Sequence, residues 1–492
     1  MNYLELLRLA FPEVHVTVAV LVVLALGLRK THSAALCSYV AAIGLALAVV
    51  AVLRLPQNAT LFGGMLVITP LTSLFKIICL ALAFFTVLLA QNDASSRRNH
   101  LEYLAIVLLA TIGLMLLVGS EELLMIFIGL ELTGLSLYVM TAFNKSDLRS
   151  AEAGLKYFLF GSTASAFTLF GLSFVYGMCG TTGLAAIGQK LTAQPVEPLL
   201  AVGIVMTLIG FAFKIAAAPF HLWAPDAYQA APIPSAAFIA SGSKVASFVV
   251  LGKIVLVGFG PVHGSAAWHA MTAGWTPVLA ALAGLSIVIG NLVALAQTNV
   301  RRLLAYSAVA HAGYTLLGLV AGGRDGYSAT LFYTTLYAFT LLGAFGVVAL
   351  VRRDSGGDDL RHFSGLRTRS PLLAGCMAIF VLSLAGLPPL AGFVGKFYLF
   401  SAAMRVGENH GLLWLVALAL FGSLISIYYY LIILKVIFVD GSSASAGVKP
   451  ELPRTIKVEL LQKISLTILA GVVLLLGITP SPLVARIIAS LP

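Results

Sequence analysis

The feature that most constrains this chain is a series of long apolar segments, which recur roughly every 25 to 40 residues with no long polar stretch between them. A helix that spans the hydrocarbon core of a bilayer needs about 20 mostly apolar residues. Charged residues make up only 10% of the 492 residues, whereas soluble domains carry about 25%. We therefore exclude a soluble enzyme and expect an all-α polytopic membrane protein.

Fourteen segments are long and apolar enough to be transmembrane helices. They are centred near residues 20, 44, 80, 110, 132, 167, 208, 245, 287, 311, 339, 388, 422 and 474. In the first segment, the apolar stretch from Val16 to Leu28 is followed by Arg29 and Lys30 without a small-residue cleavage site. This pattern favours a retained anchor over a signal peptide.

The net charge of +11 is explained by topology, because the basic residues gather in alternate loops. The odd-numbered loops hold 17 of them: Arg29, Lys30, Arg97, Arg98, Lys145, Arg149, Arg301, Arg302, Arg352, Arg353, Arg361, Arg367, Arg369, Lys449, Arg454, Lys457 and Lys463. The even-numbered loops and the termini hold six: Arg8, Arg54, Lys190, Arg324, Arg405 and Arg486. The positive-inside rule then places the odd loops in the cytoplasm and both termini in the periplasm. The polar segment Thr181 to Gln194 is expected to lie along the outer surface as a short interfacial helix.

Seven further lysines lie within or at the ends of apolar segments: Lys76, Lys156, Lys214, Lys244, Lys253, Lys396 and Lys435. A charge near the bilayer centre costs roughly 2.5 to 3.5 kcal/mol, so such residues usually face a bundle interior or a water-filled path. Four are close to a predicted helix end, from which a long stem can snorkel to the interface: Lys76, Lys156, Lys253 and Lys435. Lys214, Lys244 and Lys396 have apolar or small neighbours on both sides, and for these three we predict a function.

Glu131 is the one carboxylate predicted to lie equally deep, and it needs a partner. A buried carboxylate and a buried lysine stabilise each other's charged forms. A lysine held in this way can gain or lose a proton as its neighbour moves, which a proton relay requires. The alternative is a static ion pair that only fixes helix packing.

Proline and glycine indicate breaks in the seventh and twelfth helices. Lys214 precedes Pro219, and Lys396 follows Gly386, Pro388 and Pro389. Proline within a helix removes a hydrogen bond and clashes with the preceding turn. Unwound backbone at membrane depth is tolerated where it lines a cavity or is buried in protein, and paired breaks in two halves point to a transport site. A purely structural kink is the alternative.

Spacing supports two related halves, since 83 residues separate Glu131 from Lys214 and 85 separate His311 from Lys396. Five helices lie between corresponding elements, an odd number, so we expect two inverted five-helix repeats. His311 is a candidate relay group because imidazole exchanges protons near neutral pH, and so is His221 beside Pro219. A histidine that is simply hydrogen-bonded is the alternative. The predicted parts are an N-terminal three-helix segment at 1–100, repeats at 101–258 and 270–438, and a C-terminal helix at 460–492.

The sequence contains no recognisable cofactor site. It lacks a GxxxxGK[ST] phosphate loop, a GxGxxG after a strand and a plausible haem or metal ligand set. The four cysteines lie far apart in apolar runs and predict packed, inert thiols: Cys37, Cys79, Cys179 and Cys376. Energy for transport must therefore come from an ion gradient or from a partner.

Several long motifs, in order from about residue 100 to 435, carry a family resemblance. They are Ile128 to Met140 (IGLELTGLSLYVM), Gly154 to Phe167 (GLKYFLFGSTASAF), Gly210 to Tyr228 (GFAFKIAAAPFHLWAPDAY), Ser241 to Ala246 (SGSKVA), Asn299 to Tyr314 (NVRRLLAYSAVAHAGY) and Gly386 to Tyr398 (GLPPLAGFVGKFY). The chain resembles the antiporter-like membrane subunits of proton-translocating NADH-quinone oxidoreductase, respiratory complex I. Among the three paralogous subunits, its length, Lys396 and the GLELTGLSLYVM wording are similar to subunit N, also called subunit 2.

The resemblance implies a role for each deep residue. Glu131 and Lys214 would form the ion pair of the first half-channel, Lys244 would be the central relay, and Lys396 would be the terminal proton-exchanging group. The secondary relay candidates are His221, His311 and Lys156.

The resemblance also implies a setting. The chain would be a translocase subunit of the bacterial inner membrane without a redox site of its own, driven by quinone reduction elsewhere in the complex. NADH, FMN, iron–sulfur clusters and quinone would bind partner subunits. The expected partners are other complex I membrane subunits, including paralogous antiporter-like ones, and the lipid bilayer, but no nucleic acid. The alternative functions are a subunit of a cation/proton antiporter and one of a membrane-bound hydrogenase; a purely structural scaffold is a third possibility.

Overall fold

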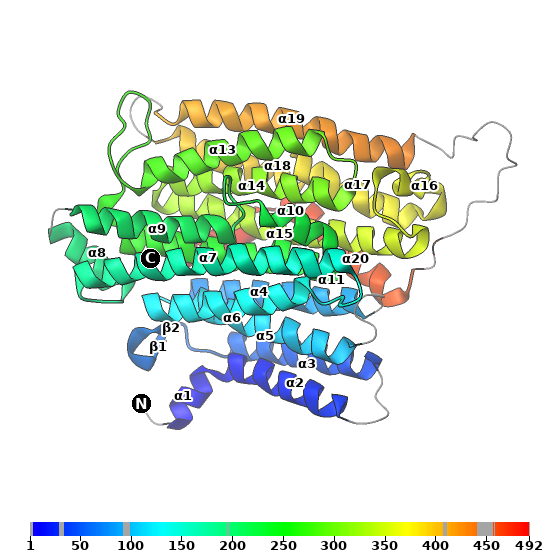
Figure 1. Ribbon diagram of the computed structural model, residues 1–492, viewed down its shortest axis with the longest axis horizontal. Helices are drawn as coiled ribbons and strands as arrows, with labels where there is room; N and C mark the ends of the chain where they lie inside the picture. The colour runs from blue at the N-terminus through cyan, green and yellow to red at the C-terminus, as the bar shows by residue number, and fades with distance from the viewer. Residues whose placement is uncertain are drawn as a thin grey trace, which may run out of the picture.

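The computed structural model describes residues 3–28, 34–91, 99–193, 196–406, 411–439, 456 and 458–491. Its helices run side by side in one bundle, with α2 and α3 at one edge and α19 at the other (Figure 1). Some residues used in the topology prediction lie outside the described residues: Arg29, Lys30, Arg97, Arg98, Gln194, Lys449, Arg454 and Lys457.

Helices α1 to α12 and two short strands form the N-terminal part and the first predicted repeat. Their bounds are α1 (Tyr3–Leu9), α2 (Phe11–Gly27), α3 (Ala34–Leu53), β1 (Ala59–Leu61), η1 (Phe62–Gly64), β2 (Leu66–Ile68), α4 (Pro70–Ala90), α5 (His100–Gly119), α6 (Leu123–Thr141), α7 (Leu148–Cys179), α8 (Leu184–Ala193), α9 (Pro198–Lys214), α10 (Trp223–Ala230), α11 (Ile233–Phe238), η2 (Ile239–Ser243), α12 (Lys244–Lys253), η3 (Ile254–Gly258) and η4 (Gly260–Val262). The strands pair antiparallel as a hairpin. The helix predicted within Thr181 to Gln194 is confirmed as α8, whereas its position on the outer membrane surface stays a prediction.

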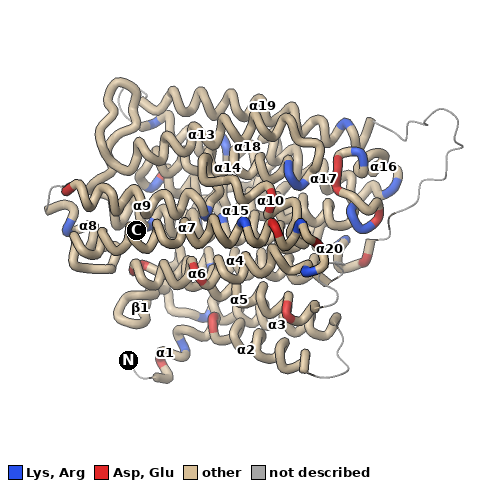
Figure 2. Tube along the Cα trace, viewed as in Figure 1, with Lys and Arg blue, Asp and Glu red and all other residues tan. Residues whose placement is uncertain are grey.

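Helices α13 to α21 form the second predicted repeat and the C-terminal part. Their bounds are α13 (Trp275–Leu295), α14 (Val300–Ala321), α15 (Gly323–Ser355), η5 (Leu360–Phe363), α16 (Leu366–Arg369), α17 (Pro371–Ala385), α18 (Ala391–Met404), α19 (Leu413–Phe438), α20 (Leu460–Ile478) and α21 (Ser481–Ser490). Basic residues gather at the end of the bundle that holds α16, as the positive-inside argument leads us to expect (Figure 2).

The all-α membrane class is confirmed. Among the described residues, eleven helices are long and apolar enough to cross a membrane, or twelve if α1 and α2, bent by 79°, form one span. The predicted centres near 208 and 388 fall on the short helix α9 and on the break between α17 and α18, and each of the other twelve falls within one of these spans. The number of fourteen crossings and the inverted relation of the repeats stay predictions.

The chain breaks beside Lys214 and Lys396, where the prolines predicted interruptions. Helix α9 ends at Lys214 and helical structure resumes at Trp223, while α17 ends one residue before Gly386. Gly386 closes α17 with a φ of 84°, a conformation that glycine adopts without strain. In the first break the amide of Ala218 donates to the hydroxyl of Ser286 at 2.8 Å. Buried partners of this kind let the backbone unwind within the bundle.

The core of the bundle is built from three nearly enclosed helical segments. These are the continuous run from α11 to η3, helix α14 and helix α15; in each, 94% of the most apolar 18-residue window is buried. Two π-helical turns, η2 and η3, flank α12, which begins at Lys244 and ends at Lys253. Helix α15 has 33 residues, which corresponds to a length of about 50 Å.

Candidate functional site

The three deep lysines are buried, as predicted. The exposed fraction is 8% for Lys214, 3% for Lys244 and 4% for Lys396. Isolated ammonium groups are costly to remove from water, so each needs polar partners. These partners differ among the three lysines.

In the first half, the Lys214 ammonium faces helix α6. Its Nζ donates to the hydroxyl of Tyr138 at 3.4 Å, and a Cβ added at Gly134 would lie 2.8 Å from it. Glu131, one turn earlier in α6, is half-buried and accepts a hydrogen bond from Ser165 of α7 at 2.5 Å. Within the described ranges, Glu131 and Lys214 form no direct ion pair. The structure therefore brings them to neighbouring turns, and the coupling predicted between them stays a proposal.

Lys244 lies between the two halves. Its Nζ donates to the carbonyl of Ala308 in α14 at 2.7 Å and lies 5.6 Å from the centre of the Tyr337 ring in α15. A cation over an aromatic face gains electrostatic stabilisation, which is larger where water is excluded. The central lysine is therefore held by a carbonyl dipole and a π face.

His311 connects α14 to α15 and α19 through hydrogen bonds to two tyrosines. Its Nδ1 lies 2.6 Å from the hydroxyl of Tyr333, and its Nε2 lies 3.2 Å from that of Tyr430. The Tyr430 hydroxyl also bonds to Ser307. Because imidazole has a donor and an acceptor nitrogen, this arrangement can pass a proton from one hydroxyl to the other.

Lys396 has neutral partners. Its Nζ donates to Ser423 at 2.8 Å and to the carbonyl of Ala385 at 3.0 Å, and it lies 5.2 Å from the centre of the Tyr314 ring. The Tyr314 hydroxyl accepts from Asn291 at 2.9 Å. Across the described parts of the chain, no carboxylate forms an ion pair with this lysine.

Tyrosines join these groups into one line, which the sequence interpretation missed. The His311 ring lies 5.0 Å from the Tyr337 ring and 5.6 Å from the Tyr314 ring. Tyr337 lies against Lys244 and Tyr314 against Lys396, so rings and hydroxyls bridge the two lysines. The signal available in the sequence was the helical spacing of Tyr314, three residues after His311, and of Tyr333 and Tyr337, four residues apart.

Three polar atoms near this line are buried without a hydrogen-bond partner among the residues that the structure describes. They are Nδ1 of His221 and the hydroxyls of Tyr228 and Tyr337. Buried polar groups are normally paired, often with ordered water. Of the three residues, His221 belongs to the first break and Tyr337 lies against Lys244.

Lys156 lies at one end of the bundle, and its side chain is 43% exposed. Its Nζ pairs with Glu152 at 2.7 Å and with Asp226 at 3.0 Å, and Asp226 also pairs with Arg302 at 2.8 Å. The cluster borders a polar cavity of about 670 Å³. Lys156 is thus connected to the first break through Asp226 of α10, but it does not touch the three deep lysines.

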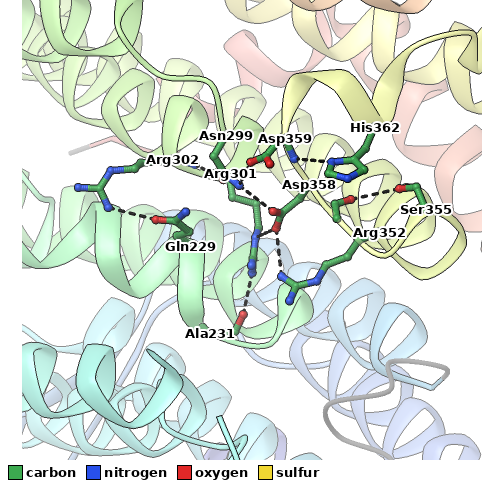
Figure 3. Close-up of polar contacts among 11 residues, drawn as sticks. Gln229, Ala231, Asn299, Arg301, Arg302, Arg352, Ser355, Asp358, Asp359 and His362 are labelled. Carbon is green, nitrogen blue, oxygen red and sulfur yellow. Dashed lines mark hydrogen bonds and ion pairs between the residues drawn. The ribbon is translucent and has the colours of Figure 1, made fainter. Parts of the chain in front are cut away.

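A second polar cluster lines the same cavity, where the chain leaves α15 (Figure 3). Asp358 pairs with Arg301 and with Arg352, the latter at 3.0 Å, and accepts from Asn299 at 2.7 Å. Burial alone would raise the pKa of Asp358, but Arg301, Arg352 and Asn299 together hold it below its ordinary value. The cluster fixes the start of α14 against the end of α15.

Two of the four lysines predicted to snorkel do not. Lys76 and Lys253 are each only 4% exposed, and they pair with Glu13 at 2.7 Å and Glu121 at 3.4 Å. The snorkelling prediction is wrong for them, because carboxylates distant in the sequence fold against them. Lys435 is exposed and Lys156 half-exposed, so snorkelling stays a prediction for these two.

The four cysteines are buried and free, as predicted for packed thiols. In the described segments, no group of three or more histidine, cysteine, aspartate or glutamate residues could hold a metal ion.

Comparisons with known proteins identify the family of the chain. Residues 120–426 match the family described as NADH:quinone oxidoreductase/Mrp antiporter, TM. NADH-quinone oxidoreductase subunit N 2 of Acidobacterium capsulatum is 44% identical over 98% of both chains, and subunit N of Desulforamulus reducens is 40% identical over 88% of this chain and 87% of its own. A chain of respiratory complex I from Thermus thermophilus with bound Aureothin has a TM-score of 0.78 at 31% identity, covering 96% of this chain and 98% of that chain.

Proposed function

Because the chain belongs to the NADH:quinone oxidoreductase/Mrp antiporter membrane family, with relatives that are subunit N, we propose that it carries protons through Glu131, Lys214, Lys244 and Lys396. It is a multi-span membrane subunit of NADH-quinone oxidoreductase and part of a translocase. Quinone reduction in partner subunits supplies the energy. NADH, FMN, iron–sulfur clusters and quinone bind those partners, and this chain has no redox site of its own.

The observation that carries the proposal is the line of groups from Lys244 through Tyr337, His311 and Tyr314 to Lys396. Ionisable groups buried in a membrane are costly and usually mark ion pathways. A static core would be stabilised as well or better by apolar residues of similar volume. The line therefore supports proton transfer rather than a structural scaffold.

The proposed sequence of steps begins at the first break. Glu131 and Lys214 exchange a proton as their separation changes, and Lys244 receives it through the unpaired polar atoms at His221 and Tyr228. His311 then relays it toward Lys396, which releases it. Lys156 serves the cytoplasmic end. The residues act within the two proposed inverted repeats, 101–258 and 270–438, between the segments 1–100 and 460–492.

The proposed location is the bacterial inner membrane, among other membrane subunits of the complex including paralogous antiporter-like ones. Both termini and α8 face the periplasm in this proposal. Reporter fusions at the two ends test it. A cytoplasmic C-terminus in a working complex would contradict the fourteen-helix topology, the orientation, or both.

A cation/proton antiporter subunit is the second candidate, because the matched family description includes the Mrp antiporter. A membrane-bound hydrogenase subunit belongs to the same class of alternatives. The complex I proposal and these alternatives predict different partner subunits. Co-purification with NADH-oxidising and quinone-binding subunits supports the first proposal, and their absence from an intact assembly supports the alternatives.

The decisive experiment compares lysines by position. Lys244→Ala in the complete complex, reconstituted in vesicles, is expected to abolish most proton translocation while the complex still assembles. Lys435→Ala is the matched control, since that side chain is exposed at the end of α19. Equal pumping by both variants, per quinone reduced, would contradict the relay.

A further inference from the structure

Helix α12 carries a second buried lysine at its other end, which the proposed relay does not use. Lys253 Nζ pairs with Glu121 at 3.4 Å and donates to the carbonyls of Val118 at 3.0 Å and Ser120 at 3.3 Å. All three partners belong to the end of α5 and the connection to α6. The ammonium is therefore surrounded by oxygen atoms while remaining almost inaccessible to solvent.

Glu121 connects this buried ammonium to the surface, since its side chain is 40% exposed. Its backbone is fixed on both sides: its amide donates to Met65 in the hairpin, and its carbonyl accepts from Leu184 at the start of α8. Topology predicts this face to be the outer one. The carboxylate is thus held where one side meets Lys253 and the other meets water.

A cavity of about 520 Å³ lies beside the same end of α12. Gly252, the neighbour of Lys253, and Tyr327 are among its lining residues. The hydroxyl of Tyr327 donates to the carbonyl of Val249 at 2.7 Å. The cavity therefore reaches the residue next to Lys253 along the helix.

A second buried pair, Lys76 and Glu13, meets the same turn. A Cβ added at Gly119 would lie 3.5 Å from Lys76 Nζ, and Lys253 bonds to the carbonyls on either side of Gly119. Two ammonium groups near one turn repel each other's charge. Among the described residues, the charged and titratable groups near this turn include Lys76 with its partner Glu13, Glu121 and Tyr327. The positive charge of Lys76 favours departure of a proton from Lys253.

We propose that Lys253 and Glu121 form a proton-release pair at the outer end of α12. Lys253 in its ammonium form gives one proton to the Glu121 carboxylate, leaving a neutral amine and a neutral carboxylic acid. Glu121 then loses that proton to water on the exposed side and returns to its carboxylate form. The amine takes up a proton from the interior, and no electron changes place.

This inference rests on the proposed function and adds a release point to it. Nine residues separate Lys244 from Lys253, about 13 Å of helix, so water must carry the proton between them. Lys244 faces α14 and α15, whereas Lys253 faces α5. One helix thereby presents a titratable group to each of two regions of the bundle.

The test uses arginine, which keeps the positive charge but stays protonated. Lys253→Arg is expected to lower the ratio of protons translocated to quinone reduced at least twofold in vesicles containing the assembled complex. Lys76→Arg is the matched control, because that lysine is equally buried and paired but is proposed only to supply charge. It is expected to keep the wild-type ratio.

Glu121→Gln provides a second measurement where arginine disturbs assembly, since the amide matches the carboxylate in shape but cannot take up the proton. It is also expected to lower the ratio at least twofold. A wild-type ratio for Glu121→Gln, or for assembled Lys253→Arg, would overturn the proposal. If Lys244→Ala abolishes pumping while both of these variants pump normally, only this inference fails; if Lys244→Ala pumps normally, the relay itself fails.

Discussion

The two helix breaks place similar lysines in different electrostatic surroundings. Lys214 lies beside helix α6, one turn from the half-buried carboxylate of Glu131. Lys396 has a hydroxyl, a carbonyl and an aromatic ring around it, with no ion-paired carboxylate in the described part of the chain. The first break therefore has a charge available to balance its lysine, whereas the second depends on dipoles.

The comparison shows that a helix break beside a buried lysine can favour two different responses, depending on the groups around the lysine. A lysine near a carboxylate changes its proton affinity when the two groups approach or separate. A lysine among neutral groups responds instead to its hydration and to neighbouring positive charge. The first break is suited to sensing a change in geometry, and the second to exchanging a proton with water.

The largest loss of proton translocation is expected for a variant at the second break. Lys396→Arg keeps the charge but cannot cycle its proton, so we expect proton translocation to fall at least about a hundredfold, the lower end of the range typical of a lost acid–base group. Vesicle pumping, quinone reduction and assembly should be measured together. Wild-type pumping by this variant would show that positive charge alone is sufficient there.

The next effect tests the charge balance of the first break. Glu131→Gln and Lys214→Ala should each impair pumping, and the double variant should lose less than the two single losses combined, with a coupling of roughly 0.5 to 3 kcal/mol. Ser423→Ala with Lys396→Ala forms the matched cycle for the second break, where we expect weaker coupling because the partner is neutral. Additive losses for Glu131 and Lys214 would remove the proposed distinction between the breaks.

A smaller effect is expected where the tyrosines meet His311. Tyr333→Phe removes the hydroxyl that lies 2.6 Å from Nδ1 and leaves the ring in place. A neutral hydrogen bond contributes about 1 kcal/mol, so pumping should slow about fivefold. Tyr103→Phe also removes a buried hydroxyl, one that bonds to Ser235 away from the line, and its pumping rate should stay closer to wild type. A larger loss for Tyr103→Phe would contradict the proposed path.

The smallest effect on pumping is expected at Asp358, outside both breaks. Asp358→Asn leaves Arg301 and Arg352 without this carboxylate, so the solubilised complex should melt at a lower temperature while pumping per quinone changes little. Thermal melting and vesicle assays measure the two properties.

The pH dependence of that melting has a definite sign. The pKa of Asp358 is lower in the folded protein than its ordinary value of 3.8, so its contribution is complete above the ordinary pKa and is lost as pH falls through the folded one. Wild-type stability should therefore fall below about pH 4 relative to the Asp358→Asn variant. Parallel curves for the two proteins would show that the ion pairs stabilise nothing.

The sequence predicted those features that depend on position along one segment. Apolar length located the helices, proline and glycine located both breaks, and apolar neighbours identified Lys214, Lys244 and Lys396 as buried. It failed where the outcome depends on contacts between distant segments. Lys76 and Lys253 lie near helix ends, yet Glu13 and Glu121 fold against them, and sequence separation gives no measure of that approach.

The aromatic part of the site escaped prediction for a related reason. Tyrosine is common in membrane helices, and no spacing alone distinguishes a packed ring from one beside a buried cation. Only the assembled bundle places Tyr337 against Lys244 and Tyr314 against Lys396. The hairpin at Ala59–Leu61 and Leu66–Ile68 was also missed, because strands of three residues are too short for periodicity to show.

Helix α15 has a mechanical consequence. At about 50 Å it exceeds the roughly 30 Å hydrocarbon thickness, so its ends extend beyond the core of the bilayer. Near one end, Arg324 donates hydrogen bonds to the carbonyls of Ile488 and Leu491. Near the other end, Arg352 forms an ion pair with Asp358. Helix α15 is therefore attached to neighbouring segments near both of its ends, and Tyr333 and Tyr337 lie between these attachments. A tilt of α15 large enough to move those rings must weaken one of these attachments. Motion of the proposed relay and motion at the helix ends are therefore mechanically linked.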